Sequence, residues 1–246
     1  MKKIVFLLIV GALFVGNGSQ LHAQILNGSF STGDFTDWTT VGGTSSGPTV
    51  VTSGATPPTG TTAALIQSTD GDSSGAQSAQ VGPITTTGTI DEVLGVTLPP
   101  TTNSNPLYDT GTFTPDNGQA IYQTFSVSTA STLTFAYSYQ TNDGYPYDSV
   151  GYVLDGSYTQ LVQTPPYPSS STPTPYTFVA PLSLSAGTHT LAFVAYNTDG
   201  PADSTSLYVT DVSTSAVPEP GEWALMILGG LGLLWARKLR LGLSGV

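Results

Sequence analysis

The chain has 246 residues, with 5 Lys and Arg against 16 Asp and Glu, a formal net charge of −11 and no cysteine. Fourteen of the acids, all except Glu219 and Glu222, lie between Gln24 and Val217, where there is no Lys or Arg. Because phosphate binding needs basic side chains, this composition excludes a nucleic-acid-binding body. The absence of cysteine excludes disulfides and thiolate catalysis. Such an acidic surface attracts divalent cations and stays soluble through self-repulsion.

Residues 1–23 are predicted to be a secretory signal peptide, which forms a helix. Two lysines follow Met1, residues 4–15 are apolar, and Ala23 is a small residue suited to cleavage before Gln24. The alternative, a permanent N-terminal anchor, is disfavoured because the apolar run is short and ends in polar residues. We therefore expect the body of the protein to fold outside the cytoplasm.

The body, residues 24–216, is predicted to be a single all-β domain. Several runs alternate between apolar and polar residues, which predicts strands with one packed face and one solvated face. These runs are 120–127, 132–139, 149–154, 176–179, 188–196 and 206–212. In the second run, Leu133, Phe135, Tyr137 and Tyr139 share one face. Turn residues separate the runs, so the pattern predicts a two-sheet antiparallel sandwich.

One short helix and several connections are also predicted. Thr89 and Glu92 match a capping box and Gly95 is a stop signal, which predicts about two helical turns. The stretches 44–62 and 164–175 are rich in Pro, Thr and Ser, and are predicted loops because proline is excluded from central strands. Turns are predicted at 142–144, 155–156 and 185–188.

The C-terminal segment, residues 217–246, has a different composition. Residues 224–236 are apolar, Trp223 and Trp235 lie near the two ends of this run, and Arg237, Lys238 and Arg240 follow it. Tryptophan prefers the membrane interface and basic residues stay on the cytoplasmic side, so a transmembrane helix is expected at about 223–236. Such a helix is shorter than the ~30 Å hydrocarbon core, and snorkelling of the basic side chains relaxes this mismatch. A buried core helix is disfavoured by the adjacent basic cluster.

Pro218-Glu219-Pro220, then Trp223, a glycine-containing apolar helix and the basic cluster occur in a fixed order. This order resembles the PEP-CTERM sorting signal of bacteria. The resemblance implies that exosortase, a membrane transpeptidase, recognises the Pro-Glu-Pro and removes the tail. It also implies that the protein is destined for the cell surface or the exopolysaccharide matrix. The expected partners are the export machinery, exosortase, the membrane through the C-terminal helix, and extracellular polysaccharide.

The body has a resemblance of its own. Residues 27–30, Asn-Gly-Ser-Phe, and 33–38, ending in Trp38, are similar to the opening of jelly-roll carbohydrate-binding-like modules. Pieces at 118–125, 185–191 and 209–213 follow in matching order. The resemblance implies a galactose-binding-like or jelly-roll sandwich whose first and last strands lie near one another. It also implies a structural Ca²⁺ at that place, for which Asn27, Asp34 and Asp211 occupy matching positions.

A second candidate Ca²⁺ site lies in the loop that begins at Asp70. Asp70 and Asp72 match the first and third positions of a calcium loop, but Val81 stands where a bidentate Glu is required. The loop is therefore either a partial site closed by other oxygens or a solvated acidic turn.

Asp143, Tyr145, Tyr147 and Asp148 combine carboxylates with aromatic rings in a predicted strand-end loop. Sugar binding uses aromatic faces and planar polar groups on loops of a rigid scaffold. The alternative is a tyrosine-rich hairpin that covers the edge of the core. A glycosidase pair of Asp143 and Asp148 would need a defined carboxyl separation, which the sequence does not give.

Residues 71–75 match the G-x-S-x-G pattern of serine hydrolases, with Ser73 as nucleophile. That motif needs a strand–turn–helix elbow and a histidine base. No amphipathic helix follows, and His189 is the only histidine left after export. We therefore expect no catalytic residues and a non-enzymatic, exported surface or matrix protein. The alternative is a carbohydrate-binding module with a defined sugar site, stabilised by Ca²⁺, and a hydrolase is the third hypothesis.

Overall fold

The computed structural model describes residues 25–42, 47–52, 62–68, 90–103, 111–113, 115, 117–141, 148–163, 173–198, 205–217, 228 and 230–232. The predicted signal peptide and sorting motif lie outside these residues. The predicted C-terminal span is described only at 228 and 230–232, which are helical. In the described part of the chain, no helix combines the length and the apolar character needed to cross a membrane.

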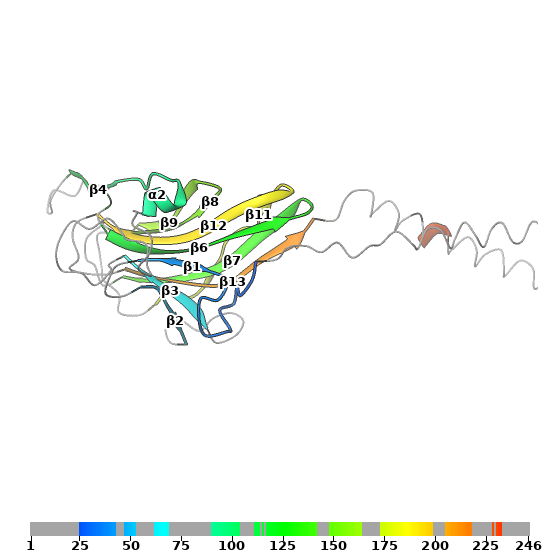
Figure 1. Ribbon diagram of the computed structural model, residues 1–246, viewed down its shortest axis with the longest axis horizontal. Coiled ribbons are helices and arrows are strands. Elements are labelled where there is room, and N and C mark those ends of the chain that lie inside the picture. The colour runs from blue at the N-terminus through cyan, green and yellow to red at the C-terminus, as the bar shows by residue number, and fades with distance from the viewer. Residues whose placement is uncertain are drawn as a thin grey trace, which may run out of the picture.

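Two antiparallel sheets pack face to face (Figure 1). The five-stranded sheet has the order β1 (Thr39–Val41), β6 (Asn117–Val127), β12 (Gly187–Asn197), β8 (Asp148–Leu154) and β9 (Ser157–Gln163). The six-stranded sheet has the order β10 (Thr177–Phe178), β7 (Ser131–Thr141), β13 (Thr205–Ala216), β3 (Ala63–Gln67) and β2 (Thr49–Val51), and β11 (Leu182–Leu184) also pairs with β7. A short ladder joins β4 (Thr101–Asn103) to β5 (Gly111–Phe113).

The predicted all-β sandwich is confirmed, and each of the six predicted runs coincides with a strand: β6, β7, β8, β10, β12 and β13. The predicted helix is present as α2 (Ile90–Leu94), and Gly95 follows it with a φ of 63°, as a helix stop requires. The prediction of a loop over 44–62 is wrong for residues 49–51. Val50 and Val51 favour a strand, and β2 lies at the sheet edge directly after Pro48, where proline is tolerated.

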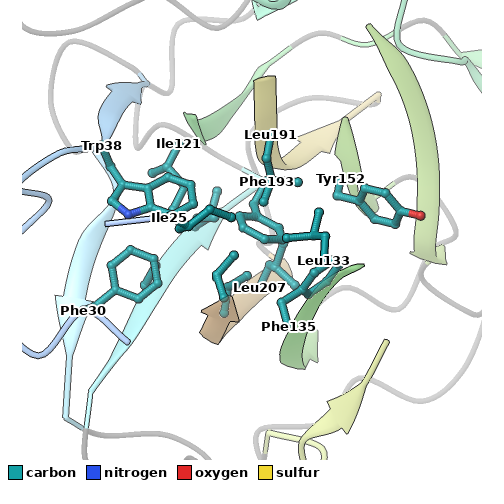
Figure 2. Packing of buried hydrophobic residues seen from close by; sticks show 14 of the residues in the cluster. Ile25, Phe30, Trp38, Ile121, Leu133, Phe135, Tyr152, Leu191, Phe193 and Leu207 are labelled. Carbon is teal, nitrogen blue, oxygen red and sulfur yellow. The ribbon is translucent and has the colours of Figure 1, made fainter. Parts of the chain in front are cut away.

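Phe193 of β12 lies in the core between the sheets (Figure 2). Its ring meets Phe135 of β7 edge-on, with centroids 4.8 Å apart, and lies 6.0 Å from the ring of Trp38. Phe193 and Phe135 are fully buried. This series of rings joins both sheets and the N-terminal segment. Burying each aromatic side chain contributes about 1.5–3 kcal/mol to the stability of the fold. Leu133 is buried beside Phe135 and Tyr137 packs against the same cluster, as the alternation predicts.

Helix α2 covers the opposite face of the five-stranded sheet (Figure 1). A second apolar cluster lies between them. Ile90, Leu94 and Leu98 of the α2 segment are buried against Val194 and Tyr196 of β12. The Tyr196 hydroxyl donates a hydrogen bond to the Pro99 carbonyl at 2.8 Å. The α2 segment therefore shields a sheet face that would otherwise expose apolar side chains.

Candidate cation site at the N-terminal loop and strand β13

The N-terminal loop, residues 25–38, is fastened to the last strand. The Val212 N–H of β13 donates to the Gly28 carbonyl at 3.0 Å. A Cβ on Gly28 would overlap the Val212 carbonyl oxygen, so this close approach requires glycine. Phe30 and Trp38 are buried on the core side, and the Trp38 indole N–H donates to the Leu26 carbonyl at 3.1 Å. The first segment thus meets the last strand, although it is a turn-rich loop rather than a strand.

Asn27 orients its side-chain amide inside this loop. Its Nδ2 donates to the Asp34 carbonyl at 3.0 Å and to the Thr36 carbonyl at 3.1 Å. Because two carbonyls require the nitrogen, the amide oxygen Oδ1 must point the other way. That oxygen is buried and has no hydrogen-bond donor among the described residues. Asn27 also has a φ of 48°, a conformation that asparagine tolerates better than most residues.

The Asp34 carboxylate stabilises its own turn. Its Oδ1 accepts hydrogen bonds from the Thr32 hydroxyl at 2.8 Å and from the Thr36 N–H at 3.0 Å. The hydrogen bonds from Thr36, and then that from Thr32, hold the pKa of Asp34 below its usual value. Of the predicted Ca²⁺ ligands, Asp34 therefore has its carboxylate oxygen Oδ1 engaged in the turn, while its backbone carbonyl accepts the Asn27 amide.

Asp211 lies at an irregularity in β13, where the register with β7 shifts between Thr210 and Ser213. Its φ is 55°, and the next residue, Val212, makes the contact with Gly28. Tyr176 is close by. Burial, then the neighbouring Tyr208 and the negative charge of Asp211, raise the pKa of the Tyr176 phenol. The Tyr176 hydroxyl is buried without a hydrogen-bond partner among the described residues.

Asn27 and Asp211, but not the carboxylate of Asp34, offer oxygen atoms of the kind that a hard cation binds. Ca²⁺ is bound by carboxylate, amide and carbonyl oxygens. The buried Asn27 Oδ1 and the Asp211 carboxylate flank the Gly28–Val212 contact and have this chemistry, whereas the Asp34 carboxylate is engaged in its turn. The described residues contain no group of three or more His, Cys, Asp or Glu suited to a metal. A cation here would rest largely on neutral oxygens, which disfavours a transition metal.

The other predicted site residues are placed only in part. Asp70 and Asp72 of the second candidate Ca²⁺ site and Asp143, Tyr145 and Tyr147 of the ligand loop lie outside the described residues. So do the sorting-motif residues Pro218, Glu219, Pro220, Trp223, Arg237, Lys238 and Arg240. Asp148 is described as the first residue of β8, and its side chain is completely buried rather than facing solvent.

His189, the histidine that a serine hydrolase would need, is already engaged through both ring nitrogens. Nδ1 lies 2.8 Å from Asp155 Oδ2, and Nε2 lies 2.9 Å from the Ser185 carbonyl oxygen. The carboxylate and the carbonyl are both acceptors, so both contacts are hydrogen bonds when both nitrogens carry protons, in the charged form of the ring. A ring held in this way has no lone pair with which to accept a proton from serine.

Sequence reasoning missed three features around these sites. Gln123 points inward from β6 and fastens the N-terminal loop, because its amide exchanges hydrogen bonds with both polar backbone groups of Leu26. Tyr176 lies in a proline-rich stretch, and nothing in the sequence indicated that it lies near Asp211. The burial of Asp148 was also missed. Alternation identifies which face is packed, but it does not identify which polar side chains that packing encloses.

No protein-family model matches the chain, and no curated protein matches it. Among solved structures, TmCBM61 in complex with beta-1,4-galactotriose aligns at 10% identity and a TM-score of 0.41, over 78% of this chain and 97% of that one. A family 35 carbohydrate-binding module from an environmental isolate aligns at 24% identity and a TM-score of 0.26, over 48% and 86%. CBM35 from Cellvibrio japonicus Abf62 aligns at 14% identity and a TM-score of 0.27, over 63% and 98%.

Proposed function

We propose that this chain is a non-enzymatic protein of the cell surface or exopolysaccharide matrix, exported by its signal peptide and cleaved at its tail by exosortase. The observation that supports this most is that buried or hydrogen-bonded residues of the body come within one or two residues of both expected processing sites in the sequence. Ile25, one residue after Gln24, is 4% exposed. At the other end β13 stops at Ala216, and the Val217 N–H donates to the Ala130 carbonyl at 2.9 Å. Cleavage at both sites would leave the sandwich intact.

The test is the intact mass of the protein recovered separately from cells and from medium. We expect a chain that starts at Gln24 and ends within 218–220. Replacing Pro218, Glu219 and Pro220 together by alanine should leave the tail attached and keep the protein with the membrane. Glu222→Ala is the matched control, because it removes a nearby acid outside the motif. A wild-type mass that retains the C-terminus in both fractions would contradict the proposal.

The body would act in the matrix through its surface. Exposed hydroxyl groups pair across neighbouring strands, with Thr124 and Thr190 oxygens 3.1 Å apart and those of Ser126 and Thr188 3.0 Å apart. No Lys or Arg lies between Gln24 and Val217. Such a surface offers hydrogen bonds to polysaccharide and carboxylates to divalent cations, which could bridge it to acidic polymers.

A defined sugar site is the second candidate function, and one feature favours it. The loop 142–147 joins β7 in one sheet to β8 in the other, so its ends are fixed on both layers. Thr141 and Asp148, the residues at its two ends, are buried. Loops held on a rigid scaffold are where binding residues concentrate, and this one carries Tyr145 and Tyr147.

Binding of soluble oligosaccharides, followed by titration calorimetry, tests the sugar site. A saturable curve that disappears in Tyr145→Ala and Tyr147→Ala would select this function. Phe178→Ala is the control, because Phe178 is an exposed aromatic residue on the edge strand β10, where it pairs with Ala136 of β7 and lies outside the loop. Unchanged binding in the tyrosine variants would rule out this loop as the sugar site.

A further inference from the structure

Strand β13 ends directly before the expected cleavage motif. Its last residues, 213–216, pair with residues 131–134 of β7, and Ala216 lies opposite Ser131. One residue later, the Val217 N–H donates to the Ala130 carbonyl at 2.9 Å. Pro218, the first residue of the Pro-Glu-Pro motif, is the next residue in the sequence. The paired end of the body is therefore directly adjacent in sequence to the residues that exosortase is expected to recognise.

The end of β13 is held by hydrogen bonds rather than by apolar burial. Val212 is 4% exposed, but the strand is exposed from Ser215 onward, and Val217 is 45% exposed. The Thr132 hydroxyl of β7 donates to the Ser215 carbonyl at 3.3 Å. Segments with exposed backbone hydrogen bonds and few buried apolar contacts open locally at low cost. This end can therefore separate from β7 while the strand up to Val212 stays packed.

Pairing with β7 and entry into an active site exclude each other. Binding sites are clefts that enclose most of the surface of the bound ligand. An enzyme that cleaves within 218–220 must therefore also surround the residues that precede the cut. Those residues are 213–217, and β7 occupies one side of their backbone. In the described part of the chain, no free stretch precedes the motif that such a cleft could enclose.

We propose that the end of β13 regulates removal of the tail, because residues 213–217 must detach from β7 before exosortase can take the motif into its active site. This proposal rests on the proposed processing by exosortase, and it concerns only the step before the peptide bond breaks. When opening and closing are fast relative to cleavage, the cleavage rate follows the population of the open form. The folded body thus slows its own release from the membrane.

A disulfide between the two strands tests this regulation. The chain contains no cysteine, so Ser131→Cys combined with Ala216→Cys introduces a single pair of thiols. Because Val217 is hydrogen-bonded to Ala130, residues 131 and 216 form a non-hydrogen-bonded pair of the ladder. The Cα atoms of such a pair are about 4.5 Å apart, which a disulfide can span. The oxidising conditions outside the cytoplasm favour its formation.

The measurement is the rate of tail loss in the producing cells, followed by pulse labelling and the mass of the labelled chain. We expect the cross-linked variant to lose its tail at least about tenfold more slowly than the wild type, since one or two hydrogen bonds already shift an opening equilibrium by that factor. A reductant added to the cells should restore the wild-type rate. Ser131→Cys alone and Ala216→Cys alone are the matched controls and should be processed as the wild type is. Equal rates for the cross-linked variant and the wild type would overturn the proposal.

A second variant covers the case in which the disulfide does not form or the double variant does not fold. A flexible Gly-Ser linker of about six residues, inserted between Val217 and Pro218, leaves the sandwich unchanged and separates the motif from β13. Its tail should be lost about tenfold faster than that of the wild type, and adding the cysteine pair to this variant should not slow it. A linker variant processed at the wild-type rate would also overturn the proposal. A tail that stays attached in the wild type and in the linker variant would contradict the processing by exosortase itself, so the two failures are distinguishable.

Discussion

His189 and Asp155 form an ion pair between strand β12 and the turn that joins β8 to β9. The Nδ1–Oδ2 distance is 2.8 Å, and the other carboxylate oxygen of Asp155 accepts the Thr190 N–H at 3.0 Å. The opposite ring nitrogen donates to the Ser185 carbonyl. The hydrogen bond to Asp155 is the main cause that raises the pKa of His189, and the Ser185 carbonyl and the charge of Asp155 act in the same direction. Burial opposes them.

This pair predicts a pH-dependent stability. Because the folded-state pKa of His189 lies above its unfolded value near 6.5, the added stability is fully present below that pH. It is lost as the pH rises through the raised pKa. We expect a contribution of about 1 kcal/mol, small because Asp155 is 47% exposed and solvent screens the pair. Thermal unfolding of the wild type and His189→Gln across this pH range measures it.

Asp155→Asn is the matched control for the pH effect. Asp155 and Gly156 have φ values of 52° and 76°, as expected for a two-residue hairpin turn. Asn-Gly suits the same turn, so the variant removes the charge and keeps the backbone. Its stability should change little above neutral pH, and its pH dependence should decrease. An unaltered pH dependence would contradict the role of the pair.

Gly28→Ala should destabilise the protein by at least about 2 kcal/mol, because the added methyl group overlaps the Val212 carbonyl and forces the N-terminal loop from β13. Gly47→Ala is the control, since nothing lies within 4 Å of a Cβ there, and it should change stability by no more than about 0.5 kcal/mol. Denaturant unfolding monitored by tryptophan fluorescence compares them. Equal stabilities would show that the loop is not fastened at this contact.

The Asn27 site predicts a stability that depends on Ca²⁺. If the buried Asn27 Oδ1 binds the ion, Asn27→Ala should reduce the loss of thermal stability that a chelator causes in the wild type. Asp34→Asn should keep the full chelator effect, because its carboxylate serves the turn with Thr32 and Thr36. Scanning calorimetry with and without chelator separates these outcomes. A chelator effect unchanged in Asn27→Ala would exclude Asn27 as a ligand.

The α2 segment should be stabilised by its apolar side chains more than by its hydrogen bond to β12. Leu94→Ala removes a buried side chain and should cost about 2–3 kcal/mol. Tyr196→Phe removes the hydrogen bond to Pro99 and should cost about 1 kcal/mol. Thr97→Ala, on the exposed side of the segment, should be neutral within about 0.5 kcal/mol. Amide hydrogen exchange in residues 90–99 reports whether the loss is local.

Alternation located the long strands, but the expected solvated face was wrong for β8, β12 and much of β13, where consecutive residues are buried on both faces of the sheet. In β7 the pattern identified Leu133 and Phe135 as core residues. It failed for short strands such as β2 and β3, because three to five residues carry little periodic information. Asn27, Asp34 and Asp211 were singled out by resemblance alone. Only the structure showed that the Asn27 nitrogen and the Asp34 carboxylate are used within the loop, because this depends on which atom of each side chain faces a neighbour.

The sequence by itself determined that the body is all-β and that every Lys and Arg lies near one of the two ends, because these depend only on residue type and order. Only the tertiary structure decided that Asp148 is enclosed, that His189 is bonded on both sides, and that Gly28 meets Val212. Each of these facts depends on segments far apart in the chain. Residues 28 and 212, or 68 and 148, come together only when the chain has folded. Local sequence periodicity does not indicate which distant residues will be in contact.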